Sequence, residues 1–279
     1  MTAPASTQPH VPPSPQRRTW VEMIMGLPVS VTLRGPGARG DRVDQAVQAL
    51  YADLRRVDRM FSTYRRDSEI SVLRSGALSR ELASPDMREV LELCVQARTL
   101  TGGFFDAEPP QPGGRRQLDP SGLVKGWAVE RAARGLGLLE GLDWLVNAGG
   151  DVLGRAIHGP AWRIAVEDPR DRTRVLCVLP LHNGAVATSG TAARGRHISD
   201  PRTGSPAADH LLSATVLGPS LTWADVLATA AFVEGPAALA RVADLPNFEA
   251  LLVLPDGRRT ATPGLAARAN RRRGHDCRD

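Results

Sequence analysis

Residues 119–146 read DPSGLVKGWAVERAARGLGLLEGLDWLV, and this one segment carries a turn, a helix and a strand signal. Its first four residues predict a tight turn, the apolar spacing from near Leu123 to about Gly135 predicts a helix, and 143–147 predicts a strand. Outward from it, helices are expected at 43–57, 84–102, 223–234 and 236–244, and strands at 28–34, 161–167, 174–181, 185–188, 212–217 and 248–254. Because helices and strands follow one another without strict βαβ alternation, the predicted fold class is α+β, with a mixed, largely antiparallel sheet and packed helices.

The basic charge of the chain is concentrated at its two ends. The 279 residues carry a formal net charge of +5, of which Arg17 and Arg18 supply two and residues 268–279 supply three, so the body is close to neutral. We expect a disordered lead at 1–18, one domain at 19–262 and a basic tail at 263–279. A basic tail is more often solvated than a binding surface, and 4% aromatic residues is low for base stacking, so no nucleic-acid partner is expected. No apolar run reaches 18 residues, so no membrane span is expected.

Lys125 is the single lysine among 35 basic residues, and it lies in the 119–130 segment. A primary amine that persists in an arginine-rich chain suggests a role that a guanidinium does not fill. Gly122 and Gly126 allow the backbone to approach something bulky, and helix N-terminal amides with an ammonium suit a phosphate. The alternative is a capped helix start with a surface lysine.

A second polar pair lies on the predicted helix 223–234. Asp225 and Thr229 are four residues apart, share one helix face, and are the polar groups of an otherwise apolar stretch. A carboxylate with a hydroxyl is an oxygen-only pair that suits Mg²⁺. The alternative is an aspartate favoured by the helix dipole and a threonine bonded to its own backbone.

Two further segments are candidates on weaker patterns. NAGGD at 147–151 follows a predicted strand, and its glycine pair could contact a ligand through the backbone or form a hairpin turn. The segment 189–206 lacks apolar periodicity and holds His197, followed by Ile198 and an Asp-Pro-Arg-Thr-Gly run. His197 could act as a general base near a phosphate, or it could be an inert loop histidine.

Seven segments, taken in order, resemble the ApbE family of Mg²⁺-dependent FAD:protein FMN transferases. They are MGLPVSVTL (25–33), FSTYRRDSEIS (61–71), TGGFFD (101–106), DPSGLVKGWAVE (119–130), NAGGD (147–151), ATSG…RHISDPRTG (187–204) and ADVLATAAFVEG (224–235). The resemblance covers about residues 20–256. It implies an ApbE-like (T-fold-like) architecture.

The resemblance also implies a site and a reaction. Asp225, Thr229 and the Gly122 carbonyl would hold Mg²⁺, and Lys125 would lie near the phosphates of FAD. Asp119 would hold a polar part of FAD, and His197 would act as general base on the acceptor hydroxyl. The FAD site would also be lined by Met25, Ser62, Thr63, Tyr64 and Ile198. The implied reaction transfers FMN from FAD to a Thr or Ser hydroxyl of an acceptor flavoprotein and releases AMP.

Two alternatives keep the same fold and FAD site. The protein could hydrolyse FAD to FMN and AMP with water as acceptor, or hold FAD without turnover.

Many members of the family carry a lipidated cysteine near the N-terminus, whereas the first cysteine here is Cys94. We therefore expect a cytoplasmic enzyme that acts on a cytoplasmic acceptor.

Overall fold

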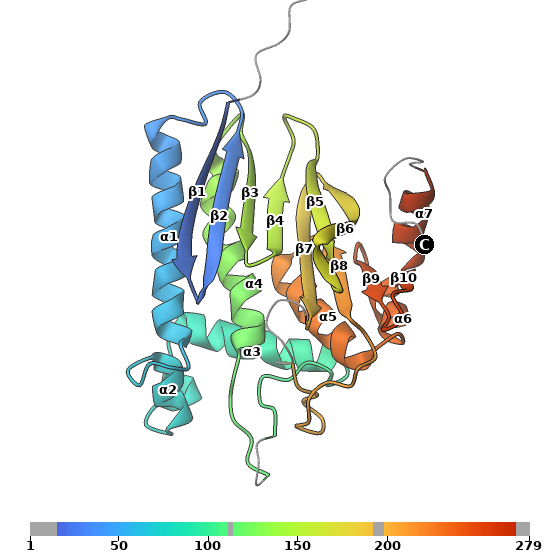
Figure 1. Ribbon diagram of the computed structural model, residues 1–279. Helices are drawn as coiled ribbons and strands as arrows, with labels where there is room; N and C mark the ends of the chain where they lie inside the picture. Colours follow the sequence, from blue (N-terminus) through green and yellow to red (C-terminus); the bar gives the residue numbers. More distant parts are fainter. Residues whose placement is uncertain (1–15, 111–113, 192–197, 272–279) are drawn as a thin grey trace, which may run out of the picture.

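The computed structural model describes residues 16–110, 114–191 and 198–271, and a long antiparallel sheet organises this part of the chain (Figure 1). The strand order is β1-β2-β3-β4-β7-β8-β9-β10, with every neighbouring pair antiparallel. The strands of this sheet are β1 (Arg17–Ile24), β2 (Leu27–Arg34), β3 (Asp143–Ala148), β4 (Asp151–Arg155), β7 (Asn183–Gly190), β8 (Ser213–Gly218), β9 (Glu249–Val253) and β10 (Arg259–Ala261).

Helices cover one face of the sheet. They are α1 (Asp41–Phe61), α2 (Glu69–Arg74), α3 (Pro85–Leu100), α4 (Ser121–Ala132), α5 (Leu221–Glu234) and α6 (Ala238–Ala243), with 3-10 turns at Arg80–Leu82 and Ala133–Leu138. Helix α7 (Pro263–Arg271) lies apart from them, and its Leu265 packs with residues of the opposite face. Figure 1 shows α1 at the left side of the sheet, beside β1, and α4 and α5 behind the strands. The largest apolar cluster joins alternate residues of β2, namely Val29, Val31 and Leu33, to these helices, as the two-residue period of a strand requires.

A separate two-stranded hairpin covers part of the other face. It consists of β5 (Trp162–Asp168) and β6 (Asp171–Leu181), which lie in front of β7 and β8 in Figure 1. Inward residues of the hairpin, such as Trp162 and Ile164, form a second cluster with Val186 and Leu217. The sheet is therefore buried on both faces in its centre.

Two tight turns bring backbone to the same end of the sheet. Met25 and Gly26 connect β1 to β2 with φ of 56° and 71°, and Gly149 and Gly150 connect β3 to β4 with φ of 63° and 108°. Positive φ at both central positions matches the twist of an antiparallel hairpin, and it favours glycine. Met25 adopts this conformation without being glycine.

The predicted fold class is confirmed, and the element limits differ in a few places. The helix expected from near Leu123 begins at Ser121, and the strand expected at 28–34 begins at Leu27. Strands β4 and β10 and the short helix α2 were not predicted, because each has at most six residues and too little periodicity to stand out. Strand β1 begins at Arg17, inside the lead expected to be disordered at 1–18, and helix α7 begins at Pro263, inside the tail expected at 263–279. Over the described ranges, none of the helices combines the length and apolar character that crossing a membrane requires.

Candidate functional site

A cavity of about 680 Å³ lies where these turns meet the starts of α4 and β8 and the end of β7. The residues that line it include ten of the predicted site residues: Met25, Ser62, Thr63, Tyr64, Asp119, Gly122, Lys125, Ile198, Asp225 and Thr229. They come from segments up to about two hundred residues apart, and the fold brings them to one place. The remaining predicted residue, His197, lies outside the described residues.

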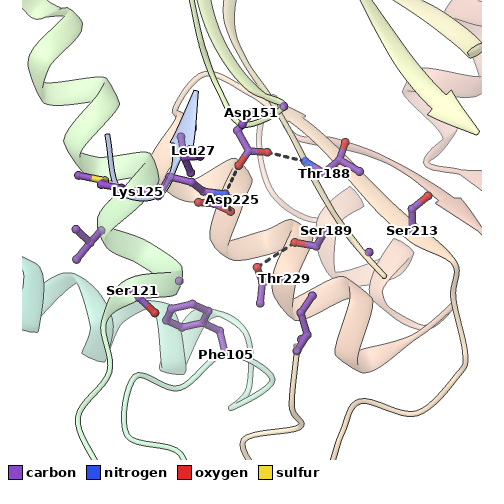
Figure 2. Close-up of a pocket in the computed structure, with 18 of the residues that line it drawn as sticks. Leu27, Phe105, Ser121, Lys125, Asp151, Thr188, Ser189, Ser213, Asp225 and Thr229 are labelled. Carbon is purple, nitrogen blue, oxygen red and sulfur yellow. Dashed lines mark hydrogen bonds and ion pairs between the residues drawn. The ribbon is translucent and has the colours of Figure 1, made fainter. Parts of the chain in front are cut away.

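Lys125 lies between two carboxylates at the centre of this cavity (Figure 2). Its ammonium Nζ forms an ion pair with Asp151 and lies 3.4 Å from Asp225 Oδ1. Burial by itself would lower the pKa of Lys125, but the two carboxylates outweigh that effect and raise the pKa above its ordinary value. Lys125 is therefore a fixed positive charge at neutral pH.

Asp151 is a site residue that sequence analysis did not single out. It directly follows the Gly149-Gly150 turn, its side chain is 4% exposed, and its Oδ1 accepts a 2.9 Å hydrogen bond from the backbone N–H of Thr188. An acidic residue immediately after a glycine pair at a strand end was the available signal. Its partner Lys125 is 26 residues away, so local spacing did not reveal the pair.

Helix α5 supplies Asp225 and Thr229 from one face, as the four-residue spacing predicts. Asp225 is buried, and the Thr229 hydroxyl lies 3.1 Å from the hydroxyl of Ser189 at the end of β7. The start of α5 is fixed by Glu130 of α4, whose carboxylate accepts hydrogen bonds from the Ser220 hydroxyl at 2.8 Å and from Thr222 N–H at 3.0 Å. Glu130 thereby sets the position of α4 against α5, and so of Lys125 against Asp225.

The two glycines of the 119–130 segment have different neighbours. A Cβ on Gly126 would lie 2.8 Å from the Leu221 carbonyl oxygen, so this glycine allows α4 to pack against α5. A Cβ on Gly122 would lie 3.1 Å from the Phe105 ring, at the cavity wall. The close approach expected at Gly126 is thus an approach to protein, whereas Gly122 lies at the cavity itself.

The residues expected around FAD form the outer part of the cavity. Asp119 accepts a 3.1 Å hydrogen bond from Ser121 N–H at the start of α4, and one of its oxygens lies 3.4 Å from Arg74. Tyr64 is 96% exposed, so its ring is free to cover a ligand. Ser62 follows the last residue of α1 directly.

The oxygen donors here fit Mg²⁺ better than a transition metal. Asp151 and Asp225 outnumber the single ammonium of Lys125, and the Thr229 hydroxyl lies on the same helix face as Asp225. Among the described residues, no group of three or more His, Cys, Asp or Glu side chains is placed to hold a metal. Mg²⁺ commonly binds through one or two carboxylates together with substrate phosphates. One excess negative charge beside a lysine suits a divalent cation that arrives with a diphosphate.

Comparison with protein families gives one match over most of the chain. A model described as "ApbE family" matches residues 25–108 and 110–252. Proteins named "FAD:protein FMN transferase" are similar in sequence. That of Haemophilus influenzae is 34% identical over 49% of this chain and 43% of its own length, and that of Treponema pallidum is 30% identical over 69% and 57%. The one from Escherichia coli K12 is 23% identical over 88% of this chain and 87% of its own length. The chain thus spans less than two thirds of the first relatives that it matches.

Solved structures share the fold. The ApbE protein from Thermotoga maritima superposes with a TM-score of 0.76 at 23% identity, over 90% of this chain and 99% of its own. The flavin transferase ApbE from Vibrio cholerae gives a TM-score of 0.75 at 24% identity, over 91% and 99%.

Proposed function

The chain belongs to the ApbE family, and on that basis we propose that it transfers the FMN part of FAD to a Thr or Ser hydroxyl of an acceptor flavoprotein, with release of AMP. One observation supports this proposal most strongly. Lys125, Asp151 and Asp225 form a charged group in the same cavity as Thr229 and the residues expected around FAD. A diphosphate is the part of FAD that needs such a group.

The site residues have separate tasks in this proposal. Asp225, Thr229 and the Gly122 carbonyl would hold Mg²⁺, which supplies charge neutralisation at the diphosphate oxygens. Lys125 orients the diphosphate, and Asp151 and Asp225 orient Lys125. Met25, Ser62, Thr63, Tyr64, Asp119 and Ile198 would surround the rest of FAD.

The bond changes follow from the products. The acceptor hydroxyl oxygen attacks the phosphorus of the FMN half, and the bond from that phosphorus to the bridging oxygen breaks. The bridging oxygen leaves with AMP, and the acceptor retains FMN as a phosphoester. A hydroxyl is a weak nucleophile unless a base takes its proton, and we propose His197 as that base.

The test is an acceptor assay with two readouts. Purified protein is incubated with FAD, Mg²⁺ and a candidate flavoprotein subunit from the same source, and intact mass and AMP are followed together. We expect the subunit to gain one FMN unit, AMP to appear in equal amount, and both to stop with EDTA. AMP and FMN release without a mass gain would support the hydrolase alternative, and FAD binding without turnover would contradict both activities. Cytoplasmic location stays a prediction, checked by fractionation of the source cells.

A further inference from the structure

The cavity extends past the residues proposed to hold Mg²⁺ and reaches the β5–β6 hairpin. The proposed function gives the residues of this hairpin no role. Five consecutive residues at the end of β5 and the start of the following turn line it: Ala165, Val166, Glu167, Asp168 and Pro169. Register shifts on both sides of Glu167 break the regular two-residue alternation here, so consecutive residues line the cavity. The end of β5 therefore lies at the cavity, and with it the edge of the strand that faces away from β6. Within the described residues β5 pairs with β6 alone, which leaves this edge unpaired.

A buried hydroxyl without a partner lies in the same cavity. Ser213 is 4% exposed, its Oγ makes no hydrogen bond, and it lines the cavity at the start of β8. By strand alternation Ser213 shares a face with Thr215 and Leu217, and Leu217 packs against the hairpin. A buried hydroxyl left without a hydrogen bond destabilises the fold, so such a group calls for a polar partner from a ligand.

The charged side chains that line the cavity at this hairpin are paired with arginines, so among the described residues this end offers no unpaired positive charge to a phosphate. Asp168 is 3% exposed, and hydrogen bonds from Arg170 lower its pKa to about 2, so it is ionised at neutral pH. Glu167 lies beside it, in an exposed ion pair with Arg172 at 2.9 Å. The unpaired backbone N–H and C=O groups of this strand edge suit the backbone of an extended peptide, as in strand addition to a sheet edge. The ammonium that suits a diphosphate lies instead on the helix side, at Lys125.

We propose that the free edge of β5 and the Ser213 hydroxyl bind an extended segment of the acceptor polypeptide and present its Thr or Ser to the flavin phosphate. This inference rests on the proposed function, and it adds the place where the acceptor binds. Ser213 acts as an acceptor-binding residue and lies apart from Lys125 in Figure 2. FAD would occupy the side of the cavity around Lys125 and Tyr64.

The test compares Ser213→Ala with a matched control, Thr260→Val. Thr260 also has a buried hydroxyl without a partner, but it does not line the cavity. Both variants should melt at or above the wild-type temperature, because each removes an unsatisfied group. Only Ser213→Ala should raise the KM for the acceptor subunit, by roughly threefold to tenfold for one lost hydrogen bond, with kcat and the Kd for FAD unchanged.

The remaining outcomes separate this inference from the proposed function. Wild-type transfer with an unchanged acceptor KM in Ser213→Ala would overturn the acceptor assignment alone. A weaker Kd for FAD in that variant, with the acceptor KM unchanged, would assign the hydroxyl to the nucleotide and also overturn it. Equal effects of Ser213→Ala and Thr260→Val on the acceptor KM would mean a general effect on the sheet. Absence of FMN transfer by the wild type would overturn the proposed function itself.

Discussion

At the residue scale, the site depends on one ammonium held in a fixed place. Lys125 has a 23% exposed side chain and two carboxylate partners. Lys125→Arg keeps the charge but replaces a compact ammonium with a larger planar group. We expect kcat/KM for FAD to fall by about tenfold to a hundredfold, since misplacing a contact by about 1 Å costs on that order.

Initial rates of FMN transfer at varied FAD measure this effect. Arg134, an exposed residue of the 3-10 turn after α4, provides a control in the matched change Arg134→Lys. Wild-type kinetics in Lys125→Arg would mean that the single lysine is a coincidence of composition.

Asp225 is the second residue whose chemistry can be tested alone. Asp225→Asn keeps the size of the side chain but removes the charge proposed to hold Mg²⁺. Transfer should fall on the order of a hundredfold or more, and the Mg²⁺ concentration at half-maximal rate should rise, because the metal supplies several kcal/mol of charge stabilisation. The exposed Asp244 gives the control Asp244→Asn. An unchanged Mg²⁺ dependence in Asp225→Asn would show that the metal site is elsewhere.

At the element scale, the packing of α4 on α5 fixes the distance between Lys125 and Asp225. Glu130 joins the two helices by hydrogen bonds at the start of α5, and Gly126 lets their backbones meet. Gly126→Ala would add a Cβ 2.8 Å from the Leu221 carbonyl oxygen and 3.0 Å from Thr222 Cα, so the helices would have to separate.

We expect Gly126→Ala to lower the free energy of unfolding by about 1–3 kcal/mol, as overpacking does, and to reduce FMN transfer further by moving Lys125. Chemical denaturation and transfer rates measure the two effects. Gly135→Ala is the matched control, because a Cβ there meets nothing within 4 Å. Equal stability of the two variants would contradict the helix contact described here.

At the scale of the whole molecule, the two ends of the sheet have different roles. The cavity lies at one end, and a buried carboxylate with several hydrogen bonds stabilises the fold at the other. Asp143, at the opposite end of β3 from the Gly149-Gly150 turn, is 1% exposed. It accepts hydrogen bonds from the Ile157 and His158 N–H groups at 2.7 and 2.9 Å, and from Arg34 at 3.0 and 3.1 Å. Burial would raise the pKa of Asp143, but these donors outweigh it and hold the pKa below its ordinary value.

This lowered pKa predicts a pH-dependent contribution to stability. The contribution is full above the unfolded pKa of about 3.9 and is lost as pH falls through the lower folded value. Asp143→Asn should therefore cost roughly 1–3 kcal/mol at pH 7, and the difference from wild type should shrink below about pH 4. Urea unfolding at several pH values measures it, with FMN transfer at pH 7 as the check that the site is intact. A difference that stayed constant down to pH 3 would contradict the role of the charge.

The sequence by itself determined the elements and part of the site. Apolar spacing located α1 and α3 because burial of one side of a helix leaves a local period in the chain. The single Lys125 and the four-residue spacing of Asp225 and Thr229 predicted residues that line the cavity. These signals can be read from the sequence because each involves only a few neighbouring residues.

Only the tertiary structure decided which distant groups meet. Asp151 pairs with Lys125 from 26 residues away. Glu130 and Gly126 of α4 contact the start of α5 about 90 to 95 residues along the chain. Strand register places Ser213 on the face of β8 that the hairpin covers, and the packing of this hairpin over the sheet brings the free edge of β5 to the cavity. Register and packing set the burial and hydrogen-bond partners of a side chain, and neither leaves a local pattern in the sequence.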